Sequence, residues 1–416
     1  MKNNYICALD IGSSKIAACV AEIRKGNLVK LFFDNVASSG VKEGIIVDSI
    51  DLIKAASKLL KGLKAKSGIN IKFIYTNISG RDILTKHSRA IIPLAERGNK
   101  VITMSDIMRV NEQARILGSG LEEEIIHLIP SSYTIDSKSN IQDPIGLYSH
   151  KLEVDLFLIC GKLSSIQSLS RVINQSGYEI KDLFFSGFAT SQAVFNRELQ
   201  GGLNLLCDIG SDITEVSVFR DGVLKDIEIL NLGGDNLTEQ LCQALKIPLD
   251  FAEDIKRSYG AIGEYQIPED KEILVRKSDF YKPIKQKLVS QVITSSAKLI
   301  CSSIKEAVEK RVPLYEINNF LIVGRTAALE GFIETLENTL GIPVKLGRLT
   351  NPRVLSLTNQ DNILSGERYL TYLTSLGMVC LATQNKLSLN MPVYQPTKNL
   401  VLKLVNRFKE VYQEYF

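Results

Sequence analysis

The most constraining feature of this chain is a phrase that occurs twice in its 416 residues. Residues 8–18 read "ALDIGSSKIAA" and residues 205–216 read "LLCDIGSDITEV"; the two aspartates, Asp10 and Asp208, are separated by 198 positions. Each copy has the pattern of a buried strand that ends in aspartate, a Gly/Ser turn and a second strand. Around both copies the pattern is three strands followed by a helix. The repeat therefore predicts an α/β fold built from two halves of one design.

A strand that ends in aspartate and enters a Gly/Ser turn suits the phosphates of a nucleotide. Glycine lets the backbone approach a phosphate closely, and successive N–H groups in a tight turn form an anion-binding concavity. The carboxylate can hold Mg²⁺ through water, because Mg²⁺ dehydrates reluctantly. One such turn is weak evidence, since Asp-Gly turns commonly connect hairpins. Two copies in the same strand context favour a clamp that holds a triphosphate from both sides.

The composition limits the class of protein. With 45% hydrophobic and 23% charged residues, the chain is long enough to bury two or more cores. A net charge of +4 argues against a nucleic-acid partner, which normally needs a concentrated basic face. Seven scattered cysteines without a CxxC motif predict reduced thiols rather than metal sites or disulfides. No signal-peptide core and no run of about 20 apolar residues is found, which predicts a protein that is soluble or lies on a membrane surface.

Two stretches interrupt the repeat. In residues 82–161, "RDILTKHSRAIIPL" and "LEVDLFLICG" read as strands around a helix at 105–117, which predicts an inserted small α+β subdomain. We also expect a helix at 50–65 that is capped by Ser49. The expected organisation is a first domain of 1–81 and 162–195 with the insertion 82–161, a second domain of 196–233 and 313–384 with a helix-rich insertion 234–312, a linker 385–399 and a helix 400–416.

The paired turns resemble the two phosphate hairpins of the actin, heat-shock chaperone and sugar-kinase superfamily. More narrowly, almost the entire chain is similar to the FtsA family of bacterial cell-division proteins. The marks are "SGVKEGIIVD" at 39–48, "IIHLIPSSYTIDSKSNIQDPIGL" at 125–147, "LFFSGFATSQAVF" at 183–195, "AEDIKRSYGAI" at 252–262 and "ALEGFIETLENTLGIPVKLG" at 328–347. The resemblance implies actin-like, duplicated ribonuclease-H-type domains around a nucleotide cleft, with residues 82–161 as an inserted SHS2-type subdomain.

The family's nucleotide motifs can be carried over to matching positions of this chain. They give the candidate contacts Asp10, Gly12, Ser13, Ser14, Lys15, Asp208, Gly210, Ser211, Gly233, Gly234, Lys256, Gly260, Gly324 and Arg325. The resemblance implies ATP or ADP as ligand, with Mg²⁺ held through water by Asp10 and Asp208. Without the resemblance, Gly233 and Gly234 also suit a plain turn, and Lys256 suits a solvated helix face.

The second turn and the adenine-side loop depart from the family pattern. Where DIGGGT is usual, this chain reads "DIGSDIT", and where LTGGGA is usual it reads "LIVGRTA". Asp212 thus stands where a glycine would let the γ-phosphate approach, and Ile213 replaces a threonine. A carboxylate about 5 Å from a phosphate charge costs on the order of 3 kcal/mol at an effective dielectric constant of about 20. We expect Arg325 to offset Asp212 across the cleft, and we expect the nucleotide to be structural or regulatory, with at most slow hydrolysis.

The last residues, 400–416, read "LVLKLVNRFKEVYQEYF" and place most apolar side chains on one helical face. Such a face usually packs on the protein's own core, but this one follows a linker that is interrupted by prolines. A helix that lies in a membrane interface is the alternative. Its candidate lipid contacts are Lys403, Leu404, Val405, Arg407, Phe408, Val411, Tyr412 and Tyr415.

The resemblance implies a function for the whole chain. It predicts an ATP-binding, polymerising protein that tethers the FtsZ ring to the cytoplasmic face of the cell membrane at the division septum and recruits other division proteins. In the family, the C-terminal peptide of FtsZ docks on the region that corresponds to residues 234–312. The alternatives are a pilus-assembly adaptor of the same fold, or a kinase of the same superfamily that transfers phosphate to a small acceptor.

Overall fold

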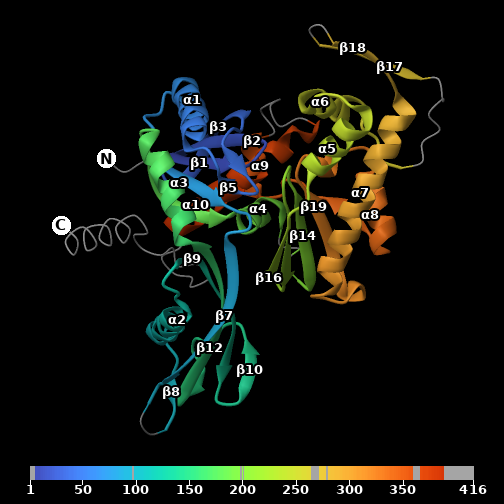
Figure 1. The fold of residues 1–416 in the computed structure, drawn as a ribbon. Helices are drawn as coiled ribbons and strands as arrows, with labels where there is room; N and C mark the ends of the chain where they lie inside the picture. The colour runs from blue at the N-terminus through green and yellow to red at the C-terminus, as the bar shows by residue number, and fades with distance from the viewer. Residues whose placement is uncertain are drawn as a thin grey trace.

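Two five-stranded sheets carry the duplicated phrases, one in each half of the molecule (Figure 1). The structure is a computed structural model that describes residues 5–95, 98–196, 199, 201–263, 271–277, 280–358 and 366–387. The strand order is β13–β6–β1–β2–β3 in the first sheet and β20–β19–β14–β15–β16 in the second. In both sheets three antiparallel strands are followed by two parallel ones on the side of the aspartate-bearing strand. This equivalence confirms the expected duplication.

The bounds of the strands follow the sequence pattern closely. The first sheet contains β1 (Tyr5–Ile11), β2 (Lys15–Arg24), β3 (Asn27–Ala37), β6 (Phe73–Ile78) and β13 (Glu179–Phe185). The second contains β14 (Leu203–Ile209), β15 (Thr214–Arg220), β16 (Val223–Leu230), β19 (Ile317–Val323) and β20 (Val344–Leu346). The central strands β1 and β14 are almost continuously buried, as expected for strands that are covered on both faces.

Helix α1 (Ser49–Ser67) covers the first sheet, and its N-terminus differs by one residue from the expectation. The cap is Asp48 rather than Ser49: its side chain accepts the N–H groups of Ile50 and Asp51. A carboxylate suits this place because the free N–H groups of a helix start attract negative charge. The helix ends at Gly68, whose φ of 69° is readily adopted by glycine.

Two helices lie where the halves meet. Helix α4 (Ser186–Val194) ends the first half in sequence, belongs to the first core and contacts strands of both sheets, whereas α10 (Leu373–Leu387) follows the second half yet packs on β1, β2 and β6. The two helices cross so closely that a Cβ at Gly377 would lie 1.8 Å from the carbonyl oxygen of Ala189. The described side chains of α10 belong to the first core, which differs from the expected second domain of 313–384.

The insertion between β6 and β13 has its own sheet and core and extends below the first half in Figure 1. Its strands are ordered β10–β9–β12–β7, and α2 (Met104–Gly118), predicted at 105–117, packs on one face. The strands are β7 (Ile83–Pro93), β8 (Lys100–Val101), β9 (Glu123–Ile135), β10 (Lys138–Ile141), β11 (Tyr148–Ser149) and β12 (Lys151–Lys162). Burial alternates in the outer part of β12 and becomes continuous towards the body, where Phe157 and Ile159 join the first core.

The second insertion is mostly helical and packs with the second sheet in a separate core. It contains α5 (Gly234–Leu245), α6 (Leu249–Tyr259), the hairpin β17 (Glu272–Lys277) and β18 (Phe280–Lys285), and α7 (Gln286–Glu309). The remaining elements are β4 (Val41–Lys42), β5 (Ile45–Ile46), α3 (Leu163–Gln175), η2 (Leu314–Glu316), η3 (Thr326–Ala328), α8 (Phe332–Leu340), α9 (Pro352–Thr358) and η5 (Gly366–Thr371).

Candidate functional site

The two repeated turns have the same backbone geometry. The N–H of Gly12 donates to the carbonyl of Lys15 at 3.0 Å, and the N–H of Gly210 donates to the carbonyl of Ile213 at 2.9 Å. A Cβ at Gly210 would lie 2.9 Å from that same carbonyl oxygen, so the turn needs glycine. The duplicated phrase therefore produces two superimposable hairpin ends, each with an aspartate two residues before the glycine.

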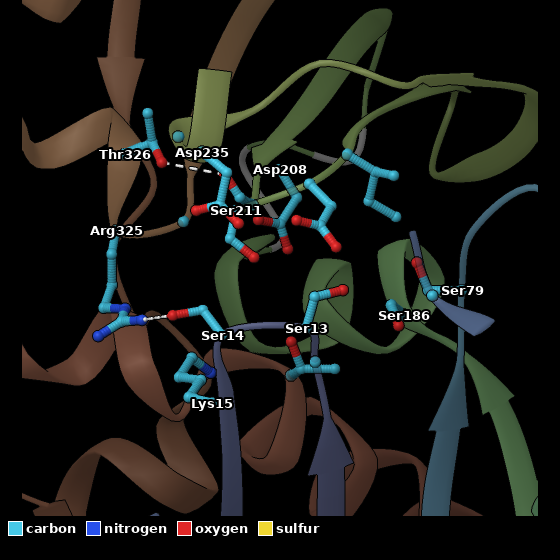
Figure 2. A pocket seen from close by; sticks show the side chains of 18 of the residues that line it. Ser13, Ser14, Lys15, Ser79, Ser186, Asp208, Ser211, Asp235, Arg325 and Thr326 are labelled. Atoms are coloured by element: carbon cyan, nitrogen blue, oxygen red, sulfur yellow. Dashed lines mark hydrogen bonds between the residues drawn. The ribbon is translucent and has the colours of Figure 1, made fainter. Parts of the chain in front are cut away.

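Both turns face one cavity of about 280 Å³ between the halves (Figure 2). Figure 2 shows Ser13, Ser14 and Lys15 on one side of this cavity and Asp208 and Ser211 on the other. The candidate contacts that line it are Asp10, Gly12, Ser13, Ser14, Lys15, Asp208, Gly210, Ser211, Gly234, Lys256, Gly324 and Arg325. The sequence expectation of paired turns around one cleft is thus matched by the geometry.

Gly233 and Gly260 are not among the lining residues. A Cβ at Gly233 would lie 2.4 Å from the carbonyl oxygen of Ser211, so this glycine lets the start of α5 pack against the second turn. Gly260 ends α6, where a Cβ would lie 2.3 Å from the carbonyl oxygen of Lys256. In this structure both glycines shape the walls rather than face the cavity.

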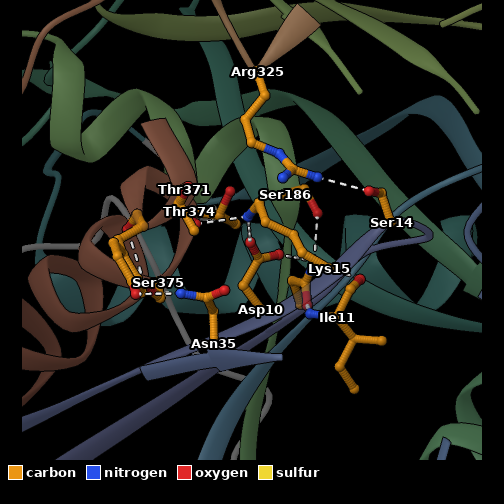
Figure 3. Close-up of polar contacts among 12 residues, drawn as sticks. Asp10, Ile11, Ser14, Lys15, Asn35, Ser186, Arg325, Thr371, Thr374 and Ser375 are labelled. Carbon is orange, nitrogen blue, oxygen red and sulfur yellow. Dashed lines mark hydrogen bonds and ion pairs between the residues drawn. The ribbon is translucent and has the colours of Figure 1, made fainter. Parts of the chain in front are cut away.

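The carboxylate of the first turn is fixed by its neighbours (Figure 3). Asp10 is buried, and its two oxygens accept from the Lys15 ammonium at 3.0 Å and from the Asn77 side-chain amide at 2.9 Å. Lys15 also donates to the carbonyl of Thr371 at 2.6 Å, which ties the turn to η5. Lys15, expected as a phosphate donor, thus neutralises Asp10 and anchors the turn.

In the second turn Ile213 takes the place of this lysine. Burial raises the pKa of Asp208 to about 6; the charge of Lys15 opposes this shift and the charge of Asp10 adds to it, both less than burial. Glu215, which pairs with Asp208 across the hairpin, is buried, and this burial raises its pKa to about 8. The Ser79 hydroxyl donates to Glu215 at 2.7 Å from the other half of the molecule. At neutral pH the buried Glu215 therefore keeps its proton.

Asp212 lies at the edge of the second turn and reaches across the cleft. One of its carboxylate oxygens accepts the backbone N–H of Glu43 at 2.8 Å. It also shares a hydrogen bond with Asp235, whose pKa is raised by burial and by Asp212. Arg325 instead donates to the hydroxyl of Ser14 at 2.6 Å (Figure 3). The arginine thus joins the adenine-side loop to the first turn and is not seen paired with Asp212, so the expected compensation between the two stays a prediction.

The wall opposite the first turn is built by α6 and the loop after β19. Lys256 is buried and donates to the carbonyl of Gly234 at 2.9 Å and to the hydroxyl of Thr238 at 2.8 Å. It is a buried lysine with internal partners, not a solvated one. Gly324 has a φ of 90°, and a Cβ there would lie 2.3 Å from the carbonyl oxygen of Ile209. Only glycine therefore lets this loop lie against the end of β14.

The sequence reasoning missed several polar lining residues, among them Asn77, Ser79, Ser186, Glu215 and Asp235. A signal existed for three of them. Asn77 and Ser79 follow the apolar stretch of β6, and the carboxyl end of a parallel strand beside the aspartate-bearing strand is where ligands bind in α/β sheets. Glu215 lies seven residues after Asp208, directly opposite it in the hairpin.

The candidate lipid contacts in 400–416 and the linker 385–399 fall wholly or mostly outside the described residues, so the structure adds nothing on them. None of the helices that the structure describes is long and apolar enough to span a bilayer.

Comparisons with known proteins agree with this architecture. A family model described as "Cell division protein FtsA" matches residues 205–373, and one described as "SHS2 domain inserted in FTSA" matches residues 80–160. The "Cell division protein FtsA" of Streptococcus pneumoniae serotype 2 (strain D39 / NCTC 7466) is 28% identical over 347 residues, which cover 83% of this chain and 76% of that protein.

Two solved structures show the same actin-like fold. The "PilM-PilN type IV pilus biogenesis complex" has a TM-score of 0.62 at 16% identity and covers 91% of this chain and 98% of its own. MreB5 of Spiroplasma citri bound to ADP has a TM-score of 0.54 at 11% identity and covers 93% of this chain and 100% of its own.

Proposed function

Because the chain belongs to the FtsA family of cell-division proteins, we propose that it is a nucleotide-binding, self-assembling scaffold that links the FtsZ ring to the membrane. The observation that carries the proposal is the pair of equivalent turns that face one cavity from opposite halves. A structural relative, MreB5 of Spiroplasma citri, is bound to ADP. We therefore propose ATP or ADP as the ligand of this cavity.

The residues present fit a nucleotide with a magnesium ion. The hydroxyls of Ser13, Ser14 and Ser211 line the cavity together with the turn backbones and supply neutral donors for phosphate oxygens. Asp10 and Asp208 line it from opposite turns, and the raised pKa of Asp208 marks a place where a cation relieves repulsion. The described residues contain no cluster of three or more acidic, histidine or cysteine ligands. A magnesium ion here would be held by Asp10 and Asp208 through its own waters, and it would supply positive charge to the phosphates.

A ligand between the turns has a mechanical consequence. The halves meet through Glu43–Asp212, Ser79–Glu215 and Ser14–Arg325, and the helices α4 and α10, which pack on each other, lie between them. A nucleotide that touches both turns favours one angle between the halves over others. We propose that this angle controls assembly of the chain into filaments.

Attachment to the membrane and to partners completes the proposal. Residues 400–416 bind lipid reversibly, through Leu404, Val405, Phe408, Val411, Tyr412 and Tyr415 with Lys403 and Arg407 beside them. A filament carries many such segments and binds firmly, because each bound segment raises the effective concentration of the next. The C-terminal peptide of FtsZ docks on residues 234–312, and other division proteins join at the septum.

One experiment tests nucleotide, filament and membrane together. The purified chain is titrated with ATP and Mg²⁺, with and without lipid vesicles, and is followed by sedimentation and electron microscopy. We expect nucleotide-dependent filaments that co-sediment with vesicles, while a Δ399–416 variant forms filaments but stays in the supernatant. Vesicle binding that survives this deletion contradicts membrane attachment through residues 400–416. The absence of any nucleotide response contradicts the proposal that the nucleotide controls filament assembly. Phosphate transfer to a small acceptor points instead to a kinase.

A further inference from the structure

The second turn differs from the first at two positions that line the cavity, where Asp212 and Ile213 replace Ser14 and Lys15, and only the first of these changes adds an acid. By the 198-position offset of the repeat, Asp212 occupies the place that Ser14 has in the first turn. Ser14 offers a hydroxyl that can donate to a phosphate, whereas an ionised Asp212 can only accept. Both residues line the cavity. The repeat thus puts a donor on one side of the cleft and an anion on the other.

The Asp212 carboxylate is held in place rather than free to swing away. Its partner, the N–H of Glu43, belongs to a turn in which Glu43 has a φ of 51° and Gly44 a φ of 75°. This turn packs against the loop after β6 so tightly that a Cβ at Gly44 would lie 2.5 Å from the carbonyl oxygen of Ser79. The hydrogen bond therefore ties the Asp212 carboxylate to a rigid part of the backbone across the end of the cavity.

The groups that normally attract a phosphate at this end are already in use. The N–H groups of Gly234 and Asp235, at the start of α5, donate to the carbonyls of Gly210 and Ser211 at 2.9 Å and 2.8 Å. The N–H of Gly233 donates to the side chain of Asn236 at 2.7 Å. The helix start therefore closes onto the turn instead of pointing at a ligand.

Each described lysine and arginine side chain that lines the cavity already has a partner in the protein. Lys15 is held by Asp10, Arg325 by Ser14, and Lys256 and Arg257 by Glu253. Beside the second turn the lining side chains are acidic: Asp208, Asp212, Glu215 and Asp235. A ligand that pushes an additional negative charge towards Asp212 meets repulsion from this fixed carboxylate.

We propose that the cavity selects a nucleoside diphosphate over a triphosphate, and that Asp212 is the residue that makes this selection. The inference rests on the proposed nucleotide function and specifies its ligand. The two phosphates of a diphosphate are served by the serine hydroxyls and turn backbones, while the terminal phosphate of a triphosphate adds a charge beside the fixed carboxylate. Because a charge pair about 5 Å apart at an effective dielectric constant near 20 carries a large penalty, the selection is tenfold or more.

Calorimetric titration of the full chain with ADP and with the non-hydrolysable analogue AMPPNP, each with Mg²⁺, tests the proposal. We expect the unaltered chain to bind ADP at least tenfold more tightly than AMPPNP. Asp212→Ser, which copies the first turn, should lower this ratio about tenfold or more by strengthening AMPPNP binding, with ADP affinity within about threefold. Asp212→Asn keeps an acceptor for Glu43 and should act in the same direction. Glu239→Gln, which removes an exposed charge from α5, should leave the ratio unchanged.

Three results would overturn the selection. They are equal affinity for the two nucleotides in the unaltered chain, an unchanged ratio in Asp212→Ser, or a parallel loss of both nucleotides in that variant, which would make Asp212 a holder of Mg²⁺. Retained ADP binding by the variants shows that they are folded. A chain that binds neither nucleotide contradicts the proposed function itself, and this outcome differs from a failure of selection, in which ADP still binds.

Discussion

The two hairpins of the repeat share a backbone but not a charge pattern. In the first, the acid Asp10 lies beside its own cation, Lys15, and opposite the small Ala17. In the second, the equivalents of Lys15 and Ala17 are Ile213 and Glu215, so a cation is replaced by an apolar residue and a methyl group by a buried acid. The first hairpin therefore supplies the countercharge for its own acid. The second has acids with raised pKa values and therefore depends on a proton, a cation or the other half of the molecule.

This difference shows which properties of a duplicated site are set by the backbone and which by side chains. The turn geometry and the aspartate position are kept in both copies, because the strands and the glycine fix them locally. The surrounding charges differ between the copies: Asp10 of the first hairpin is paired with Lys15, whereas Asp208 and Glu215 of the second have raised pKa values. A nucleotide with its magnesium ion meets both, and it supplies positive charge where the second hairpin lacks it.

The largest effect is expected from removing the cation of the first hairpin. Lys15→Met leaves the buried Asp10 without its partner and removes the link to Thr371, so the free energy of unfolding should fall by about 3 kcal/mol. Calorimetry or urea denaturation at pH 7 without nucleotide measures it. Lys54→Met breaks an exposed ion pair with Asp51 and should lower the free energy of unfolding far less, because solvent screens this pair. Equal losses in the two variants would contradict an anchored first hairpin.

The second hairpin should show its buried acid in the pH dependence of stability. Glu215 has a folded pKa of about 8 against an ordinary value of 4.5, so the folded state keeps a proton that the unfolded state loses as the pH rises through this window. Stability linked to this group is therefore lost with increasing pH. Glu215→Gln, which cannot ionise, should gain about 2 kcal/mol relative to the unaltered chain between pH 6 and pH 7.5.

Thermal unfolding at several pH values provides that comparison. The difference between Glu215→Gln and the unaltered chain should widen with pH and level off above about pH 8. The exposed Glu239→Gln should give a curve parallel to that of the unaltered chain. Parallel curves for Glu215→Gln as well would show that the second hairpin holds no extra proton.

A smaller effect is expected from the hydrogen bond that supports this acid across the cleft. Ser79→Ala removes the donor to Glu215 and should lower the free energy of unfolding by about 1 kcal/mol. Ser168→Ala, which removes an exposed hydroxyl that bonds within α3, should change it by less than about 0.5 kcal/mol. If Ser79→Ala is as mild as this control, the two halves do not meet through Glu215.

The smallest expected effect is a coupling energy near zero between Asp212 and Arg325. Because these side chains bind Glu43 and Ser14 respectively, their substitutions should add within about 0.5 kcal/mol in a cycle of Asp212→Asn, Arg325→Met and the double variant. Unfolding is measured without nucleotide. A coupling above about 1 kcal/mol would support the view that the arginine compensates the aspartate.

The sequence revealed the duplicated fold, both turns and the inserted subdomain, because these features depend on residues that are close together in the chain. The contacts across the cleft were not predictable in this way. Ser79 meets Glu215 over 136 positions, Glu43 meets Asp212 over 169, and Ser14 meets Arg325 over 311. Local patterns of burial and turn chemistry contain no information on such pairs. The packing of α10 on the first sheet escaped prediction for the same reason, since an apolar helix shows its periodicity but not the sheet it will cover.

The measurement that tests the account most directly is a crystal structure of the chain grown with ADP and Mg²⁺. The account predicts one nucleotide per chain, with its phosphates in contact with both residues 12–15 and residues 210–213, and a magnesium ion between Asp10 and Asp208 that is reached through water. A nucleotide that touches only one turn, or that binds outside the cavity they share, would contradict it.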